Sequence, residues 1–437
     1  MKISMRILST ITLVLLVEAG LIYLNQSEWR AAESEPFSNH LDWVTTWGGT
    51  GYDNAKSVVV NGGNIYVAGT TRSYGAGLSD IFLLKYDPNG DLTWNKTWGG
   101  VSFDGCWATA ADNEGIYVAG FTYAVGNLNA NTALLKFDSD GNLIWSRTWG
   151  GDEDAVARGV TVDGNGAVYV AGYLRGTTTT TKSFLLRYDQ AGKLIWNTTF
   201  GGVGVNAFAV GVGNGVYVDG TNETTVNNLY ESKMFLTKFN EDGSIIWSRQ
   251  WGNTPINYCW SISVDGDNIY QAGTTSDGSN NSDAVLLNYD ASGNLRFNVT
   301  WGKTEEEYAW GVTGSNNYIY LTGHIYNKTS IGFDTLLVKF AVDGTPIWNV
   351  TYGDKSADVA HSVSVDGNDI YVTGITTGVD QNSQVLLLKY TSANEVSTLG
   401  ASWTAAAATA IAILTLTAFV LQILDHKRIS TNPSHSS

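Results

Sequence analysis

One repeating position of this sequence carries side chains that could bind a ligand. It lies nine residues after an aromatic residue that recurs every 50 or 51 residues, and its occupants are Lys56, Trp107, Arg158, Ala209, Trp260, Trp310 and His361. Indole rings can stack on a sugar or anchor a partner's loop, and the two cations can hold a carboxylate. We therefore expect a ligand platform for carboxylated sugars or acidic side chains, formed by Lys56, Trp107, Arg158, Trp260, Trp310 and His361. Ordinary packing of these residues is the alternative.

Signals for catalysis or metal binding are weak. Only two of the five histidines, His324 and His361, lie within the repeats, and the sequence has neither a Gly-x-Ser-x-Gly nor a His-Glu-x-x-His motif. Cys106 and Cys259 occupy a small, buried position three repeats apart, which predicts free thiols. At this position the other repeats carry Ala55, Ala157, Phe208, Ala309 and Ala360. The sequence thus predicts no catalytic residue, no metal site and no cofactor.

The elements that must position the platform are short strands. In the first repeat, residues 55–60, 64–70, 80–86 and 92–98 are rich in β-branched and aromatic residues, and Gly-Gly and Asn-Gly dipeptides suit the hairpin turns between them. The recurring aromatics are Trp47, Trp98, Trp149, Phe200, Trp251, Trp301 and Tyr352. Four antiparallel strands in about 50 residues form one propeller blade. We expect the platform to lie near one mouth of the central channel, because the first strand of each blade is innermost.

The ends of the repeat region predict a closed ring. Seven second strands and seven fourth strands can be counted, but one fourth strand is surplus at residues 41–47 and one is missing after Tyr390. Residues 41–47 would therefore complete the last blade and leave no open sheet edge. The sequence predicts an all-β, seven-bladed propeller of four-stranded blades over residues 41–391.

The repeat resembles the seven-bladed β-propeller (SBBP-type) repeat family of secreted archaeal and bacterial surface proteins. The resemblance rests on Trp-Gly-Gly, on Tyr-x-x-Gly, on Asp-x-x-Gly-x-x-x-Trp, and on the acidic residues Asp53, Asp104, Glu307 and Asp358. It implies a surface location and an interaction role, with no single activity. The Asp-x-x-Gly turns also resemble those of quinoprotein dehydrogenases, but these enzymes have eight blades and a vicinal cysteine pair. Turns 87–91 and 138–142 look calcium-like, but they are too short for an EF-hand loop, so hairpin turns explain them better.

Both ends of the chain indicate a membrane. Lys2 and Arg6 precede an apolar run typical of a signal peptide or signal anchor over 1–24. Residues 403–424 carry no charge and can span a hydrocarbon core of about 30 Å, and Lys427 and Arg428 follow. We expect linkers at 25–40 and 392–402, a transmembrane helix at 403–424, a cytoplasmic tail at 425–437, and the propeller outside the cell.

The expected function is that of a membrane-anchored interaction module for a protein or glycan at the cell surface. A structural envelope protein is the alternative, and an extracellular hydrolase or lyase ranks behind both. The net charge of −16 argues against nucleic acid as a partner. The sequons also suit an extracytoplasmic location. Besides the one at Asn25, the candidate glycosylation sites are Asn95, Asn197, Asn222, Asn280, Asn298, Asn327 and Asn349.

Overall fold

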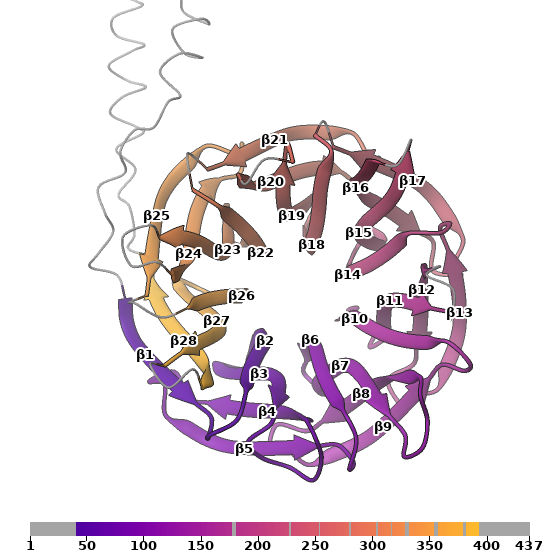
Figure 1. Cartoon of the computed structure of the whole chain (residues 1–437), viewed down its shortest axis with the longest axis vertical. Helices are drawn as coiled ribbons and strands as arrows, with labels where there is room; N and C mark the ends of the chain where they lie inside the picture. Colours follow the sequence, from indigo (N-terminus) through magenta and orange to yellow (C-terminus); the bar gives the residue numbers. More distant parts are fainter. Residues whose placement is uncertain are drawn as a thin grey trace, which may run out of the picture. The chain divides into compact units, whose positions relative to one another are not determined.

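The computed structural model describes residues 41–392 except 177–180, 227–228, 253, 279–280, 303–304, 316, 328–331, 354–356 and 379–381. These residues form 28 strands in seven four-stranded antiparallel sheets. The sheets stand like blades around one axis, with β2, β6, β10, β14, β18, β22 and β26 innermost (Figure 1). The predicted seven-bladed β-propeller is confirmed.

Each blade uses its four strands in the same order, from the axis outward. The innermost strands are β2 (Asp53–Asn61), β6 (Asp104–Asp112), β10 (Asp154–Val162), β14 (Val205–Gly213), β18 (Ile256–Asp265), β22 (Glu307–Ser315) and β26 (Asp358–Asp366). The second strands are β3 (Asn64–Thr71), β7 (Gly115–Tyr123), β11 (Val168–Arg175), β15 (Gly215–Val226), β19 (Asn268–Ser276), β23 (Tyr318–Asn327) and β27 (Asp369–Thr377). The third strands are β4 (Asp80–Tyr86), β8 (Ala130–Phe137), β12 (Thr181–Tyr188), β16 (Leu229–Phe239), β20 (Ser282–Asp290), β24 (Gly332–Ala341) and β28 (Ser383–Thr391).

The outermost strands are β5 (Leu92–Trp98), β9 (Leu143–Trp149), β13 (Leu194–Phe200), β17 (Ile245–Trp251), β21 (Leu295–Trp301), β25 (Pro346–Tyr352) and β1 (Leu41–Trp47). β1 pairs antiparallel with β28, from Leu41 opposite Tyr390 to Trp47 opposite Val385, and so completes the last blade. The predicted closure by residues 41–47 is therefore confirmed. The apolar cores lie between neighbouring blades, as where Val385 and Leu387 of the last blade pack with Phe82 of the first.

One face of the propeller, here called the turn face, holds the hairpin turns. On it, six of the seven outermost strands place an aromatic ring against the turn glycine of the next blade; β25 does not, because β28 and β1 of the last blade are not joined by a turn. A Cβ on Gly90, whose φ is +87°, would lie only 2.9 Å from Trp43 Cδ2, and Trp43 Nε1 donates to Pro88 O at 3.3 Å. Further pairs are Trp94 on Gly141, Trp145 on Gly192, Trp196 on Gly243, Trp247 on Gly293 and Phe297 on Gly344. This inter-blade contact explains the Asp-x-x-Gly-x-x-x-Trp pattern.

The opposite face, here called the loop face, holds the connections between blades and between second and third strands. Asp53 ties these connections together in the first blade: its carboxylate accepts hydrogen bonds from Gly49 N at 2.8 Å and Ser73 Oγ at 2.6 Å. Arg72 N also donates to Tyr52 O at 3.0 Å. The acidic residue after Trp-Gly-Gly thus has a structural role, because it holds two loops against each other.

The predicted terminal segments 1–24, 25–40 and 403–424, the tail 425–437 and nearly all of the linker 392–402 lie outside the described residues. Across the part of the chain that the structure describes, no helix has the length and apolar character needed to cross a membrane.

Candidate functional site

A β-bulge in every innermost strand positions the candidate site. In β2 the pairing with β3 shifts between Ala55 and Ser57, which leaves Lys56 as the extra residue. β6, β10, β14, β18, β22 and β26 carry a shift at the same place. A bulge re-aims the unpaired side chain, here from the innermost strand of each blade. The seven bulge residues, here called the bulge ring, are Lys56, Trp107, Arg158, Phe208, Trp260, Trp310 and His361.

The glycine of Tyr-x-x-Gly makes the bulge possible. Gly69 pairs with Ala55 just before the bulge, and a Cβ there would lie 2.0 Å from Asn54 O and 2.6 Å from Phe82 Cζ. No side chain fits at that distance. The equivalent glycines of the other blades meet the same carbonyl just as closely. The motif thus marks the place where the innermost strand turns a side chain out of the ladder.

The structure corrects one member of the predicted series. In the fourth blade the bulge lies between Ala207 and Ala209, so Phe208 belongs to the ring and Ala209 does not. The small buried position of that blade is accordingly Ala207, not Phe208. The cause is a connection one residue shorter between Phe200 and the bulge. Alignment on the small residue before the bulge, rather than on the aromatic residue, would have found Phe208 in the sequence.

Two cations flank one indole in the first three blades. The Arg158 guanidinium carbon lies 3.5 Å from the centre of the Trp107 ring and Lys56 Nζ lies 5.0 Å from it. Because they come from the blades on either side of Trp107, they cover its two faces. Such contacts stabilise cations over aromatic rings. Among the described residues, no carboxylate forms an ion pair with Lys56 or Arg158.

Lys56, Trp107 and Arg158 are here called the cationic arc. His361 joins this arc to the last blade as a neutral imidazole. Its Nδ1 lies 2.9 Å from Ala55 O, which can only accept, so Nδ1 carries the proton. Its Nε2 then accepts from Lys56 Nζ at 3.4 Å. Burial, with the charge of Lys56 beside it, holds the pKa of His361 well below its usual value. His361 thus adds an acceptor for Lys56 rather than a third positive charge.

Burial also changes the two cations. It lowers the pKa of Lys56 to about 8, with the positive charge of Arg158 as the second cause. Burial lowers the pKa of Arg158 to about 10. Desolvation disfavours the charged form of each group, and a nearby anion would favour it. A carboxylate bound beside Lys56 and Arg158 would therefore stabilise their charged forms.

The other side of the ring is aromatic. Ring centres are 5.0 Å apart between Phe208 and Trp260, and 4.7 Å apart between Trp260 and Trp310. Trp260 thus contacts a neighbour from the blade on each side. The Arg158 guanidinium carbon lies 4.9 Å from the Phe208 ring, and Trp310 lies 5.9 Å from the His361 ring. With the contacts of the cationic arc, these close an unbroken circle of seven side chains.

Hydrogen bonding differs among the three indoles. Trp310 Nε1 donates to His324 Nδ1 at 3.0 Å, and burial lowers the pKa of His324 to about 4, which keeps that acceptor free of a proton. Trp107 Nε1 and Trp260 Nε1 have no acceptor among the described residues. Buried indole N–H groups usually have a partner. Each of the seven ring residues is partly exposed.

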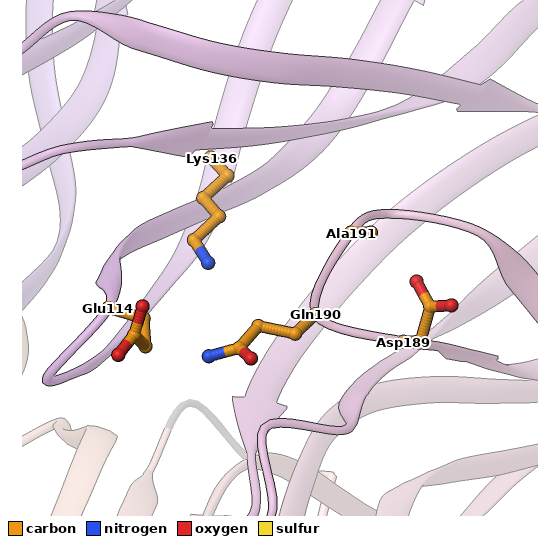
Figure 2. Close-up of a pocket in the computed structure, with 5 residues that line it drawn as sticks. All are labelled: Glu114, Lys136, Asp189, Gln190 and Ala191. Atoms are coloured by element: carbon orange, nitrogen blue, oxygen red, sulfur yellow. The ribbon is translucent and has the colours of Figure 1, made fainter.

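A shallow pocket lies on the turn face, away from the ring. It has a volume of about 460 Å³ and is lined by Glu114, Lys136, Asp189, Gln190 and Ala191. Figure 2 shows the Lys136 and Gln190 side chains extending towards one another beside Glu114. Lys136 Nζ lies 5.1 Å from the centre of the Tyr117 ring, a contact that the other blades repeat with Lys85 on Tyr66 and Lys238 on Tyr217. Lys136 therefore belongs to the repeated framework.

The other residues predicted from the sequence are the two cysteines and the candidate glycosylation sites. Cys106 and Cys259 are buried free thiols, as predicted. Asn95, Asn197 and Asn298 are exposed on outermost strands, and Asn349 and Asn222 are partly exposed. Nothing is described for the side chains of Asn280 and Asn327. Within the described ranges, no group of three or more His, Cys, Asp or Glu residues is placed to hold a metal ion.

Comparisons with known proteins find sequence similarity over part of the chain only. No family model matches. The regulatory protein FlaEY of Caulobacter vibrioides is 25% identical over 239 residues, which are 46% of this chain and 24% of FlaEY. An uncharacterized WD repeat-containing protein, L264 of Acanthamoeba polyphaga mimivirus, is 22% identical over 35% of this chain and 14% of its own length. The chain thus matches a quarter or less of each of these relatives.

Several solved structures are similar to this chain at low sequence identity. The endosialidase of phage phi92 has a TM-score of 0.49 and 11% identity over 82% of this chain and 70% of its own. The β-propeller domain of the Trilobed protease from Pyrococcus furiosus has a TM-score of 0.48 and 10% identity over 80% and 98%. The assignment of seven closed blades rests on the sheet topology of this chain itself.

Proposed function

We propose that this chain is a membrane-anchored interaction module of the cell surface, and that its bulge ring binds a carboxylate group of a protein or glycan. The observation that carries the proposal is the cationic arc. Lys56 and Arg158 flank Trp107 and form no ion pair with a carboxylate of the described residues. In a chain of net charge −16, two such cations on one aromatic ring are locally unusual.

The geometry favours a carboxylate that approaches the ring edges over a sugar that lies flat on an indole. Trp107 contacts a cation on each face, and Trp260 contacts a ring on each side. Flat stacking on either indole would require the ring to open. A carboxylate could instead accept hydrogen bonds from Lys56 and Arg158 while these contacts remain in place. The role is binding, and the proposal needs no catalytic residue.

The cell-surface location is supported by the sequence. The charged and apolar pattern of residues 1–24, the uncharged run 403–424 with its basic flank, and the resemblance to secreted repeat proteins all favour it. Exposed sequons on outermost strands suit a glycosylated outer surface. Protease added to intact cells should therefore release most of the repeat region. Protection of that region until the membrane is broken would contradict the orientation.

Two carboxylate probes test the ring directly. The full chain in detergent is titrated with poly-L-glutamate and with oligogalacturonate, followed by tryptophan fluorescence, with neutral dextran as the blank. At least one acidic probe should bind, and Arg158→Gln should weaken it about tenfold or more, as loss of one partner of a charged contact does. Arg72→Gln is the matched control, because Arg72 is exposed on the loop face and lies over Tyr52, outside the ring. Absence of binding by both probes, or unchanged binding by Arg158→Gln, would refute the proposal.

A further inference from the structure

Exposed apolar side chains gather on the loop face of the first two blades. Leu78 is 57% exposed, Val101 62%, Val125 79% and Leu128 92%, and Phe103 is 43% exposed. Single exposed apolar residues are common, but several together on neighbouring loops mark an interaction site. These five residues are here called the loop-face patch.

The loops that carry the patch are joined to one another. Leu78 N donates to Ser102 O at 3.1 Å, and Tyr123 N donates to Phe103 O at 3.1 Å. Ser79 and Phe103 also form a parallel bridge. Val125 and Leu128 follow in the loop between β7 and β8, which begins directly after Tyr123. The patch is therefore held by backbone hydrogen bonds across the boundary of the two blades.

The patch lies at the loop-face end of the strand that carries Trp107 of the cationic arc. Phe103 immediately precedes β6, and Trp107 is the fourth residue of that strand. Lys56 is the fourth residue of β2 in the neighbouring blade and contacts Trp107 from that side. Lys56 and Arg158 are only partly exposed, whereas the five patch residues are 43–92% exposed on the loops. A ligand on the patch can thus reach the cations only with a projecting group.

The chemistry of the patch selects the kind of ligand. Four of the five patch side chains are leucine or valine, which offer sugars neither hydrogen bonds nor flat rings but are ordinary anchors for apolar side chains of a protein. A flat membrane surface could cover the patch, but its phosphates would not enter a recessed ring. Charge complementarity with Lys56 and Arg158 then requires an acidic group on the same partner.

We propose that the loop-face patch and the cationic arc together bind a protein segment in which an acidic side chain is flanked by apolar residues. The acidic side chain enters the bulge ring and the apolar residues cover Leu78, Val125 and Leu128. This inference rests on the proposed function, because it takes the ring as the carboxylate site and names a protein segment as its partner.

A random-peptide display library, selected on the full chain in detergent, tests the inference. The enriched peptides should share an acidic residue next to apolar ones, and Arg158→Gln and Leu128→Asp should each weaken them about tenfold or more. Leu128→Asp should leave binding of the plain carboxylate probes unchanged. Ile246→Asp is the matched control, because Ile246 is 49% exposed on the outermost strand β17.

The outcomes separate this inference from the proposed function. If the unaltered chain does not bind the plain carboxylate probes, both the proposed function and this inference are refuted. This inference alone is refuted if the chain binds the carboxylate probes but the enriched peptides lack an acidic residue. It is also refuted if Leu128→Asp leaves the affinity for the enriched peptides unchanged. Binding of phosphatidylcholine–phosphatidylglycerol vesicles that is lost in Leu128→Asp would assign the patch to a membrane and would also overturn it.

Discussion

The two faces of the propeller use the same repeat in opposite ways. On the turn face, the same pair recurs from blade to blade: an aromatic ring on a glycine whose backbone leaves no room for a Cβ. In the half of the innermost strands nearer the loop face, the bulge position has the same backbone in all seven blades and holds lysine, arginine, histidine, phenylalanine and three tryptophans. Repetition of a side chain thus accompanies a packing role, and variation on a fixed scaffold accompanies the recognition role that we propose.

This difference has a physical basis. A docking ring must fill the same space between each pair of blades, so a change of its size costs packing energy. A bulge residue points away from the ladder, and its backbone is fixed by the opposing glycine whatever the side chain is. The comparison predicts that changes on the turn face reduce stability and that changes on the loop face reduce binding.

The largest effect should follow from deletion of residues 41–47. The deletion removes β1 and leaves β28 as an open edge of the last blade, which exposes unpaired backbone groups. We expect a lower melting temperature and aggregation, seen by calorimetry and light scattering. An unchanged melting temperature would mean that β1 does not close the ring.

A single docking aromatic should have the next largest effect. Trp145 is nearly buried, packs on Gly192 and donates to Gln190 O at 3.2 Å. Trp145→Ala should lower the free energy of unfolding by about 3–5 kcal/mol, measured by chemical denaturation. Its neighbour Ile144 is 51% exposed, so Ile144→Ala should change it by less than about 0.5 kcal/mol. Equal losses of unfolding free energy in the two variants would contradict a packing role for the docking aromatic on the turn face.

A smaller, pH-dependent effect should come from the interior between the faces. Asp219 is fully buried and accepts a hydrogen bond from Cys259 Sγ at 3.0 Å, and burial raises its pKa to about 7. Because this folded-state pKa exceeds the unfolded value, the contribution of Asp219 to stability is complete below about pH 4 and is lost as pH rises through about 7. Asp219→Asn should remove this loss of stability, so above about pH 7 the variant should be more stable than the unaltered chain. Exposed Asp140→Asn should follow the unaltered chain, and a pH profile unaffected by Asp219→Asn would contradict the assignment.

The smallest predicted effect sharpens the loop-face side of the comparison. The pKa of Lys56 is lowered to about 8, so its charge is complete below that value and is lost above it. Affinity for an acidic probe should therefore decrease a few-fold as pH rises through about 8, or somewhat higher because the bound anion favours the protonated amine. Arg158, whose pKa is about 10, should keep the remaining binding. Lys56→Met should flatten the profile, and an identical profile in that variant would exclude Lys56 from the site.

Most of the fold could be predicted from the sequence because its signals are local and repeated. The offset of 41–47 predicts the closure by β1, and dipeptides such as Asn89-Gly90 predict the turns. The sequence also identified six of the seven ring residues. It misplaced Phe208, because one residue is missing between Phe200 and the bulge and counting from an aromatic residue cannot detect this.

Other features of the site depend on contacts between blades. Lys56 and Arg158, which cover the two faces of Trp107, lie 51 residues before and after it in the sequence. No local sequence pattern predicts how close they come to the ring. The neutral state of His361 likewise depends on Ala55 O and Lys56, about 305 residues earlier in the chain. The loop-face patch arises because separate loops of two blades meet through backbone hydrogen bonds.

A crystal structure of the full chain with a bound acidic peptide or oligogalacturonate would test the central claim most directly. We predict that a carboxylate of the ligand enters from the loop face and contacts Lys56 and Arg158 at the edge of the Trp107 ring. A ligand bound instead on the turn face, for example beside Lys136 and Glu114, with the bulge ring unchanged, would contradict the assignment of recognition to the bulge ring.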